Sequence, residues 1–350
     1  MVVTGEAQRE AWLRRVLPPV EQPRPDLWSI PVPIPGNPMR YTLSYAFVAD
    51  GGILLVDPGW DSADGRRILA EGLAAAGATP ADVAGIVLTH IHPDHHGMTG
   101  WLREVSGAWI GMHPLEAANL PGRAWKDRRH PGIDPGWLRH QGVPEEELAG
   151  LSVAADRVEA LLAMAEPDRL IEDGDLLPFP GRAVRAVWTP GHTPGHLCLH
   201  DAGAGVLLTG DHVLPRITPN IAVLPTSAGD PLGAYVSSLR KTAAFDADEA
   251  LPAHEWRFRG LKGRTDDIIA HHEKRDAEIM RAVDLLDEPT AWHIAASLTW
   301  SRGWDALHGL LRRMALAETL AHLWHLTEIG MVAPTHGDPA LWLRSSNVHR

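Results

Sequence analysis

The sequence predicts an α/β domain followed by a smaller α-helical domain. Short apolar segments bounded by Gly, Pro or Asp recur through the first 262 residues, as expected of strands. Apolar residues recur at helical spacing after about residue 263. A length of 350 residues suits two domains. We therefore expect an N-terminal extension over residues 1–27, an α/β domain over 28–262 and a helical domain over 263–350.

The first half of the α/β domain predicts a strand–helix–strand unit. Prolines in PPVEQPRP and IPVPIPGNP predict that residues 1–40 run along the surface in extended form before the first strand. Residues 41–48 and 52–56 are expected to form two strands joined by a tight turn at Asp50-Gly51. A helix over 62–76 and a buried strand over 84–88 follow.

The second half predicts four further short strands, at residues 183–188, 197–200, 206–209 and 249–253. Between the two halves, residues from about 101 to 168 are expected to form a largely helical insertion that covers a site. Val158, Leu161 and Leu162 show the helical spacing there.

The C-terminal region predicts a small helical domain. A charged amphipathic helix is expected over residues 266–287, Thr290 is a candidate cap for a second helix, and residues 307–329 are expected to form two more.

Charge and cysteine content narrow the functional classes. Lys and Arg total 32 against 44 Asp and Glu, a formal charge of −12 that disfavours nucleic acid as a partner. The one cysteine, Cys198, cannot form an internal disulfide, and we expect a buried structural thiol. The sequence opens without the pattern of a secretory signal, and no apolar run approaches the ~18 residues of a membrane span. We expect a cytoplasmic protein without a membrane partner; a homo-oligomer is left open.

The 20 histidines point to metal chemistry. Residues 89–97 read Thr-His-Ile-His-Pro-Asp-His-His-Gly, directly after the predicted strand 84–88. In a loop leaving a strand, His90 and His92 can share one face while Asp94 and His95 turn toward a second point. One short segment can thus serve two cations. Imidazole and carboxylate together suit zinc first, and also iron or manganese.

Three more apolar segments end in a metal-ligand type: His192 in VWTPGHTPGH, Asp211 in VLLTGDH and His254 in ALPAH. Strand ends converge in α/β folds, so these side chains are expected to meet the first segment. An aspartate suits the position between two cations, because each of its oxygens can bind one.

In their order and spacing, these motifs resemble those of the metallo-β-lactamase-fold hydrolases over about residues 28–262. Residues 90–95 match the family's HxHxDH signature, and Asp57 in LLVDPG matches another motif. The resemblance implies a four-layer αβ/βα sandwich and two divalent metal ions. It assigns one metal to His90, His92 and His192, the other to Asp94, His95 and His254, and the bridging position to Asp211. The C-terminal helices resemble the winged-helix-like tail of some members.

Two such cations would hold a water and lower its pKa from 15.7 toward ~7. The resulting hydroxide is expected to attack the carbonyl of a small-molecule ester, lactone or thioester, with Asp94 and Asp211 as catalytic residues. Asp94 would orient the water or pass a proton to the leaving group. The alternative is a metal-dependent ribonuclease of the same fold, which the tail suggests. A redox enzyme on iron is less favoured because no flavin-binding domain follows, and a non-catalytic protein because no ligand is missing.

A second set of residues is expected near the ligands or the substrate. Asp57 ends a buried strand, where an unpaired carboxylate is costly, so we expect it to orient a ligand histidine. His96 and His196 either donate to ligands or pack as ordinary buried histidines. The polar residues expected to face the substrate, each with a purely structural role as the alternative, are Arg40, Tyr41 and Arg216.

Overall fold

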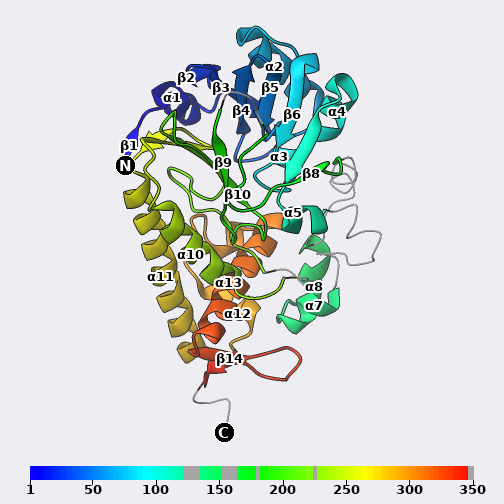
Figure 1. Cartoon of the computed structure of the whole chain (residues 1–350). Helices are drawn as coiled ribbons and strands as arrows, with labels where there is room; N and C mark the ends of the chain where they lie inside the picture. Colours follow the sequence, from blue (N-terminus) through cyan, green and yellow to red (C-terminus); the bar gives the residue numbers. More distant parts are fainter. Residues whose placement is uncertain (121–134, 152–163, 179–181, 224–226, 346–350) are drawn as a thin grey trace. The chain divides into compact units, whose positions relative to one another are not determined.

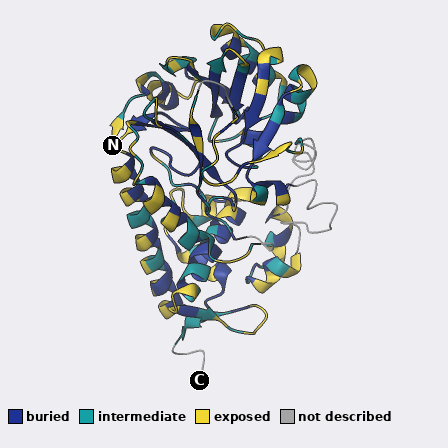
Figure 2. Ribbon diagram, in the orientation of Figure 1, coloured by how far each residue is buried: buried dark blue, intermediate teal, exposed yellow. Residues whose placement is uncertain are grey.

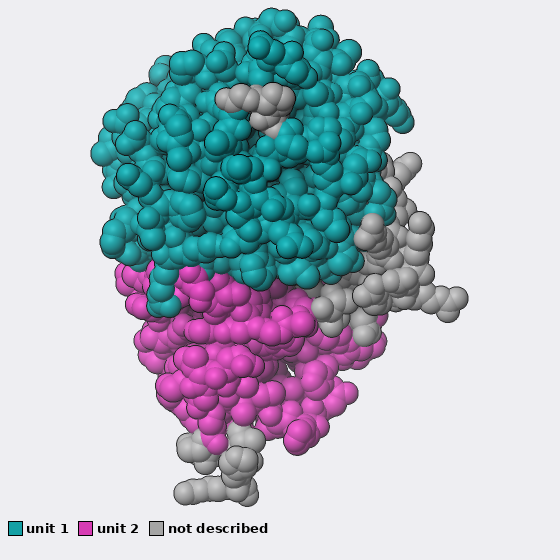
Figure 3. Space-filling view, viewed as in Figure 1, with its two compact units in different colours: residues 1–123, 158–219, 238–266 teal, residues 124–157, 220–237, 267–350 magenta. Residues whose placement is uncertain are grey.

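The computed structural model describes residues 1–120, 135–151, 164–178, 182–223 and 227–345. The chain divides into two compact units, which Figure 3 colours separately. Unit 1 comprises residues 1–123, 158–219 and 238–266, and unit 2 comprises residues 124–157, 220–237 and 267–350. Unit 2 therefore takes two segments from within the predicted α/β domain in addition to the C-terminal region.

Unit 1 contains a seven-stranded sheet with the order β2-β3-β4-β5-β6-β7-β8 (Figure 1). Strands β2 to β5 pair antiparallel, and β5 to β8 pair parallel. The strands are β2 (Glu21–Arg24), β3 (Leu27–Pro33), β4 (Tyr41–Ala49), β5 (Gly52–Val56), β6 (Val83–Val87), β7 (Trp109–Met112) and β8 (Arg169–Leu170).

The second sheet of unit 1 has six strands in the order β1-β13-β12-β11-β10-β9. Only the β11–β12 pair is parallel among the strands described in this sheet. The strands are β1 (Val2–Val3), β9 (Val184–Trp188), β10 (Leu197–Asp201), β11 (Val206–Gly210), β12 (Glu249–Pro252) and β13 (Phe258–Arg259). The strands predicted over 41–56, 84–88 and the second series are confirmed to within about two residues.

Alternation along the strands builds the core of unit 1. In β4, Leu43, Tyr45 and Phe47 join one apolar cluster with β11 residues such as Leu208, so this cluster lies between the two sheets. Ala46, on the opposite face of β4, joins a second cluster with Leu69 of α2 (Ala63–Ala75). The central strands are accordingly buried on both faces (Figure 2). The result is a sandwich of two sheets with helices outside the seven-stranded one.

The N-terminal region differs from the prediction. Residues 1–40 do not merely run along the surface: they contain β1, α1 (Glu6–Arg14), β2 and β3, and Leu27, Ile30 and Val32 are fully buried. The prolines are tolerated because β2 pairs with β3 only as far as Ser29. Beyond that residue, none of the described strands pairs with Pro31 or Pro33 on the β2 side, so their missing N–H groups are not needed there.

The other helices of unit 1 are short. They are η1 (Pro80–Asp82), α3 (Pro93–His96), α4 (Thr99–Ser106) and α5 (Pro114–Ala118). The predicted helix over 62–76 is α2, which begins after Ser62, whose hydroxyl accepts the Gly65 N–H at 3.0 Å.

Helices dominate the described part of unit 2. Those that lie wholly within it are α7 (Pro135–His140), α8 (Glu145–Leu148), η2 (Ala149–Leu151), α12 (Ala291–Ser297), η3 (Trp304–Ala306) and α13 (Leu310–Glu328). A two-stranded sheet of β14 (Val332–Pro334) and β15 (Trp342–Arg344) follows. Helices α10 (Pro231–Thr242) and α11 (Leu261–Leu285) include residues of both units. As predicted, Thr290 caps α12 by accepting the His293 N–H.

Two predictions about helices need correction or lie outside the structure. The range 307–329 contains one long helix, Leu310–Glu328, rather than two, because neither Gly nor Pro interrupts that segment. The predicted insertion over about 101–168 begins too early, because residues 109–112 form β7, which pairs with β6 in the seven-stranded sheet. Its helical positions Val158, Leu161 and Leu162 lie outside the described residues. None of the helices described combines the length and the apolar character needed to cross a bilayer.

Candidate metal centre

Seven predicted ligands come together in unit 1 as two neighbouring groups. The first contains His90, His92, His192 and Asp211, and the second contains Asp94, His95 and His254. The segment after β6 supplies four of them, and the loops that follow β9, β11 and β12 supply one each. All these loops leave the carboxyl ends of strands, which is why residues 164 positions apart in sequence, from His90 to His254, share one site.

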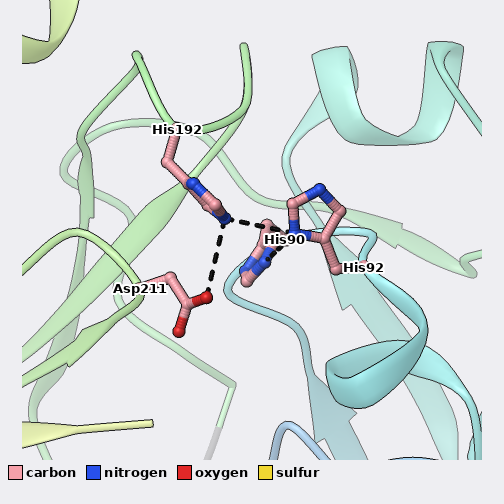
Figure 4. A group of neighbouring side chains, drawn as sticks. All are labelled: His90, His92, His192 and Asp211. Atoms are coloured by element: carbon pink, nitrogen blue, oxygen red, sulfur yellow. Dashed lines mark hydrogen bonds and ion pairs between the residues drawn. The ribbon is translucent and has the colours of Figure 1, made fainter. Parts of the chain in front are cut away.

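The first group converges on a small volume (Figure 4). His92 Nδ1 lies 2.9 Å from His90 Nε2 and 3.1 Å from His192 Nε2. Asp211 completes the group, with its Oδ2 at 3.6 Å from His192 Nε2.

The second group lies on the other side of Asp211. His254 Nε2 is 3.4 Å from Asp94 Oδ2, and His95 Nε2 is 3.9 Å from the same oxygen. Both rings also face Asp211 Oδ1, at 3.2 Å for His254 and 3.6 Å for His95. The two oxygens of Asp211 therefore point to different groups.

Hydrogen bonds to Nδ1 orient three of the candidate ligand histidines. Asp57 Oδ2 accepts the Nδ1–H of His95 at 2.8 Å, and Asp57 in turn accepts the backbone and hydroxyl hydrogens of Thr89 at 2.8 and 2.7 Å. Thr89 Oγ1 lies 3.0 Å from His90 Nδ1, and the Tyr41 carbonyl accepts the Nδ1–H of His254 at 2.8 Å. With their Nδ1 atoms engaged, His90, His95 and His254 present Nε2 to the centre of the site.

The atoms at the centre suit metal ions. His95 Nε2 and Asp211 Oδ1 are buried and have no hydrogen-bond partner among the described residues, a costly arrangement in a protein interior. Imidazole nitrogens and carboxylate oxygens are the donors that zinc, iron and manganese accept. The residues present therefore fit two divalent cations.

The histidines of the two groups have pKa values that are shifted in opposite directions. Burial, followed by the neighbouring His192, lowers the pKa of His92 to about 3. In the second group burial acts in the same direction, but the carboxylates Asp211, Asp57 and Asp94 outweigh it and hold the pKa of His95 well above its usual value. The second group thus has an excess of negative charge that a cation would neutralise.

His196 supports the site without joining either ligand group. Its Nε2 accepts the backbone N–H of Asp211 at 3.2 Å, and its Nδ1 donates to Thr189 Oγ1 at 2.8 Å. His96 instead donates to the carbonyl of Ala165 at 3.0 Å, and burial lowers its pKa to about 4. Cys198 is buried, and burial raises the pKa of its thiol to about 12, as expected of a structural cysteine.

The residues expected to face substrate have protein partners within unit 1. The fully buried Tyr41 hydroxyl donates to the Glu255 carbonyl at 2.8 Å, and Arg216 Nε donates to the Glu255 carboxylate at 2.9 Å. Arg40 donates to the Trp12 carbonyl and lies 3.8 Å from that indole ring. Tyr41 serves the site through its backbone carbonyl rather than its phenol.

Glu116 is a buried carboxylate at the site that sequence reasoning missed. It accepts the backbone N–H groups of Ile91 at 2.8 Å and Gly195 at 2.6 Å. Burial raises its pKa to about 6, against the lowering effects of the Thr193 side chain and of these backbone N–H groups. Its segment, MHPLEAAN, has no pattern that marks it, because its partners lie 25 and 79 residues away.

The comparisons with known proteins agree with this geometry. The family model described as "Metallo-beta-lactamase superfamily" matches residues 38–254, a span that includes every candidate ligand. The chain belongs to this superfamily. It is a hydrolase of the metallo-β-lactamase type with a candidate His/Asp metal centre.

Relatives within the superfamily include a lactamase-like protein, nscB, of Arthroderma gypseum, 31% identical over 69% of this chain and 74% of that protein. Atrochrysone carboxyl ACP thioesterase AgnL7 of Paecilomyces divaricatus is 33% identical over 47% of this chain, and the match spans about half (51%) of that relative's length. The structure of a metallo-beta-lactamase family protein from Thermus thermophilus is 30% identical, with a TM-score of 0.77, over 92% of this chain and 99% of that chain.

Proposed function

We propose that this hydrolase uses two divalent cations to cleave a small acyl substrate, a thioester in the first place and otherwise an ester or lactone. The observation that carries the proposal is the position of Asp211, whose Oδ1 faces His95 and His254 while its Oδ2 faces His192. A carboxylate placed between two ligand groups suits two cations rather than one.

The ligand sets follow from the two groups. His90, His92 and His192 would hold one cation, Asp94, His95 and His254 the other, and Asp211 would bind both. Zinc is the proposed metal, and iron or manganese would accept the same donors. When bound, such a pair supplies a hydroxide nucleophile at neutral pH and polarises the carbonyl under attack.

The protein's own side chains have separate tasks in this reaction. Asp94 is the proposed proton carrier: its carboxylate oxygen lies at the centre of the second group, 3.4 Å from His254 Nε2, and its side chain is 18% exposed. A carboxylate with access to solvent can take a proton from the nucleophile and release it to the leaving group. Asp57, Thr89 and the Tyr41 carbonyl would keep the ligand nitrogens aimed at the centre.

Two observations favour an acyl substrate over RNA. AgnL7 is named as a thioesterase, and its match to this chain supports the thioester within the acyl class. The formal charge of −12 argues against a groove that holds several phosphates. We also propose the four-layer form of the sandwich, a catalytic domain over residues 28–262 and a winged-helix-like character for the C-terminal helices.

A substrate panel tests this function. The kcat/KM values of the zinc-loaded chain are measured for thioester, ester and lactone substrates and for single-stranded RNA, each at low and physiological salt. We expect acyl hydrolysis with a shallow salt dependence. In the contrary outcome, acyl hydrolysis is negligible and RNA is cleaved, with a slope of log affinity against log salt concentration of about −0.7 per contacted phosphate. That result would overturn the proposal in favour of a ribonuclease.

A further inference from the structure

Glu116 lies behind the first ligand group and contacts both loops that supply its histidines. It belongs to α5, its side chain is fully buried, and its two carboxylate oxygens have different partners. Oε2 accepts the N–H of Ile91, the residue between His90 and His92. Oε1 accepts the N–H of Gly195, in the loop from His192 to His196. We infer that Glu116 is a positioning residue that sets the spacing between these loops and so the affinity of the first metal position.

The connection matters because the two loops leave strands of different sheets. Residues 90–92 follow β6 of the seven-stranded sheet, and His192 follows β9 of the six-stranded sheet. A backbone hydrogen bond from Leu197 N to Thr89 O, 2.9 Å long, joins the same segments beside the strands. Glu116 adds a second connection, next to the ligands themselves. The two connections together hold the loops beside each other.

This role requires a carboxylate. Two N–H donors approach from separate loops, so both side-chain oxygens must accept. A glutamine would present its NH₂ group to one of the two donors and leave that N–H without an acceptor. An aspartate is one methylene shorter and would not reach both loops from α5.

Gly195 gives independent support. A Cβ atom there would lie 2.8 Å from Glu116 Cγ, from Glu116 N and from His113 Nδ1. The His192 loop therefore contacts the start of α5 so closely that a methyl group would have to separate them. Gly195→Ala and Glu116→Gln disturb the same contact from opposite sides.

The inference rests on the proposed two-cation function. It adds that the two metal positions depend on different supporting residues. The contacts of Glu116 reach the loops of the first group, whereas His95 and His254 of the second group are held by Asp57 and the Tyr41 carbonyl. Loss of Glu116 should therefore weaken one metal position and spare the other.

The test compares Glu116→Gln, Glu116→Ala and Gly195→Ala with Glu249→Gln in the whole chain. Glu249 is a matched control, because it is also a buried glutamate of unit 1 but pairs with Arg257 and Arg24 away from the ligands. Zinc affinity is measured by chelator competition. The absorption spectrum of the cobalt-loaded protein reports the ligand field, and the Tm is measured on the metal-free protein.

We expect the Glu116 and Gly195 variants to lose ~10–100-fold affinity at one of two zinc positions, the range typical for residues that support metal ligands. Their cobalt spectra should change, and excess zinc should restore part of the activity. Glu249→Gln should lower the Tm and leave both affinities and the spectrum as in the wild type.

Wild-type affinities and spectra in Glu116→Gln and Gly195→Ala, with only a lower Tm, would overturn the inference. If the Glu116 variants do not fold, Gly195→Ala decides the question alone. The zinc stoichiometry of the wild-type chain tests the proposed function separately. The inference about Glu116 is tested by the ratio of variant to wild-type affinity, which is a different measurement.

Discussion

Buried histidines gather in two regions, the strand ends of unit 1 and the unit 2 part of helices α11 and α13, and their ring nitrogens are used differently. In unit 2 the side chains form a chain of hydrogen bonds. His272 Nδ1 lies 3.2 Å from His322 Nε2, and His322 Nδ1 donates to Asp276 at 2.6 Å. In unit 1 the rear nitrogens are engaged and the front nitrogens converge with carboxylates.

This difference separates a candidate metal site from a structural network. Both regions contain a buried ring nitrogen without a hydrogen-bond partner among the described residues, His95 Nε2 in unit 1 and His272 Nε2 in unit 2. Within the described part of the chain, however, three or more ligand atoms come close enough to hold an ion only in the two groups of unit 1. Convergence of donors, rather than the number of histidines, is therefore the useful signal.

The largest contrast is expected between Asp211→Ala and His322→Asn. Removing the shared carboxylate should abolish binding of two metals and reduce kcat/KM by more than the ~10–100-fold typical of a residue that only supports a ligand. His322→Asn should leave the metal content unchanged, because its partners are His272 and Asp276. Elemental analysis and acyl hydrolysis measure both effects. A normal metal content in Asp211→Ala would remove the basis for the contrast.

A smaller effect is expected at His196. Its loss leaves the Asp211 backbone N–H without its acceptor, so His196→Ala should lower kcat/KM by ~10–100-fold and weaken metal binding. His96→Ala is the control, because this equally buried histidine bonds to the Ala165 carbonyl. If His196→Ala proved more damaging than Asp211→Ala at full metal content, the assignment of ligand and supporting residue would be wrong.

Acid stability tests the buried histidines of unit 2. Burial, followed by the neighbouring His322, lowers the pKa of His272 to about 2, whereas the unfolded residue titrates near 6.5. The unfolded state therefore binds a proton that the folded state does not, so stability is retained above pH 6.5 and falls as the pH decreases. His272→Gln should make the free energy of unfolding less pH-dependent by at most about 1.4 kcal/mol per pH unit between about pH 6 and 4. Urea unfolding at several pH values checks this, and equal slopes for variant and wild type would refute it.

Helix caps provide the smallest effect and a comparison of the units without metal chemistry. Ser62 in unit 1 and Thr290 in unit 2 each accept a backbone N–H at the start of a helix. Replacement of either by Ala should cost ~1 kcal/mol of stability and leave the metal content unchanged. Denaturant titrations with parallel metal analysis measure this, and loss of metal in either variant would show that the cap matters to the site.

The grouping of the candidate ligands could be predicted from the sequence because their signal is local. Each lies directly after a short apolar strand, and the strand ends bring these positions together. The family match and the thioesterase relative support the hydrolase and acyl interpretations, whereas the ligand roles, the zinc, the cellular compartment and the domain boundaries stay predictions.

The parts that sequence reasoning missed depend on distant contacts. Because of the prolines in residues 1–40, the sequence did not predict strand β3, whose burial depends on pairing with β4. Glu116 was missed because its two hydrogen bonds join it to loops of both sheets. Arg40 donates to the Trp12 carbonyl and Arg216 to the Glu255 carboxylate, while their proposed place near the substrate stays a prediction. Such partners are set by tertiary packing and leave no periodic pattern.

The most direct test of the central claim is the number of metal ions per chain. The whole chain is loaded with zinc at neutral pH, freed of excess metal and analysed for zinc and protein together. Two ions per wild-type chain, reduced in Asp211→Ala, is the result expected if Asp211 binds both cations. A wild-type chain that binds no metal at neutral pH would contradict the account.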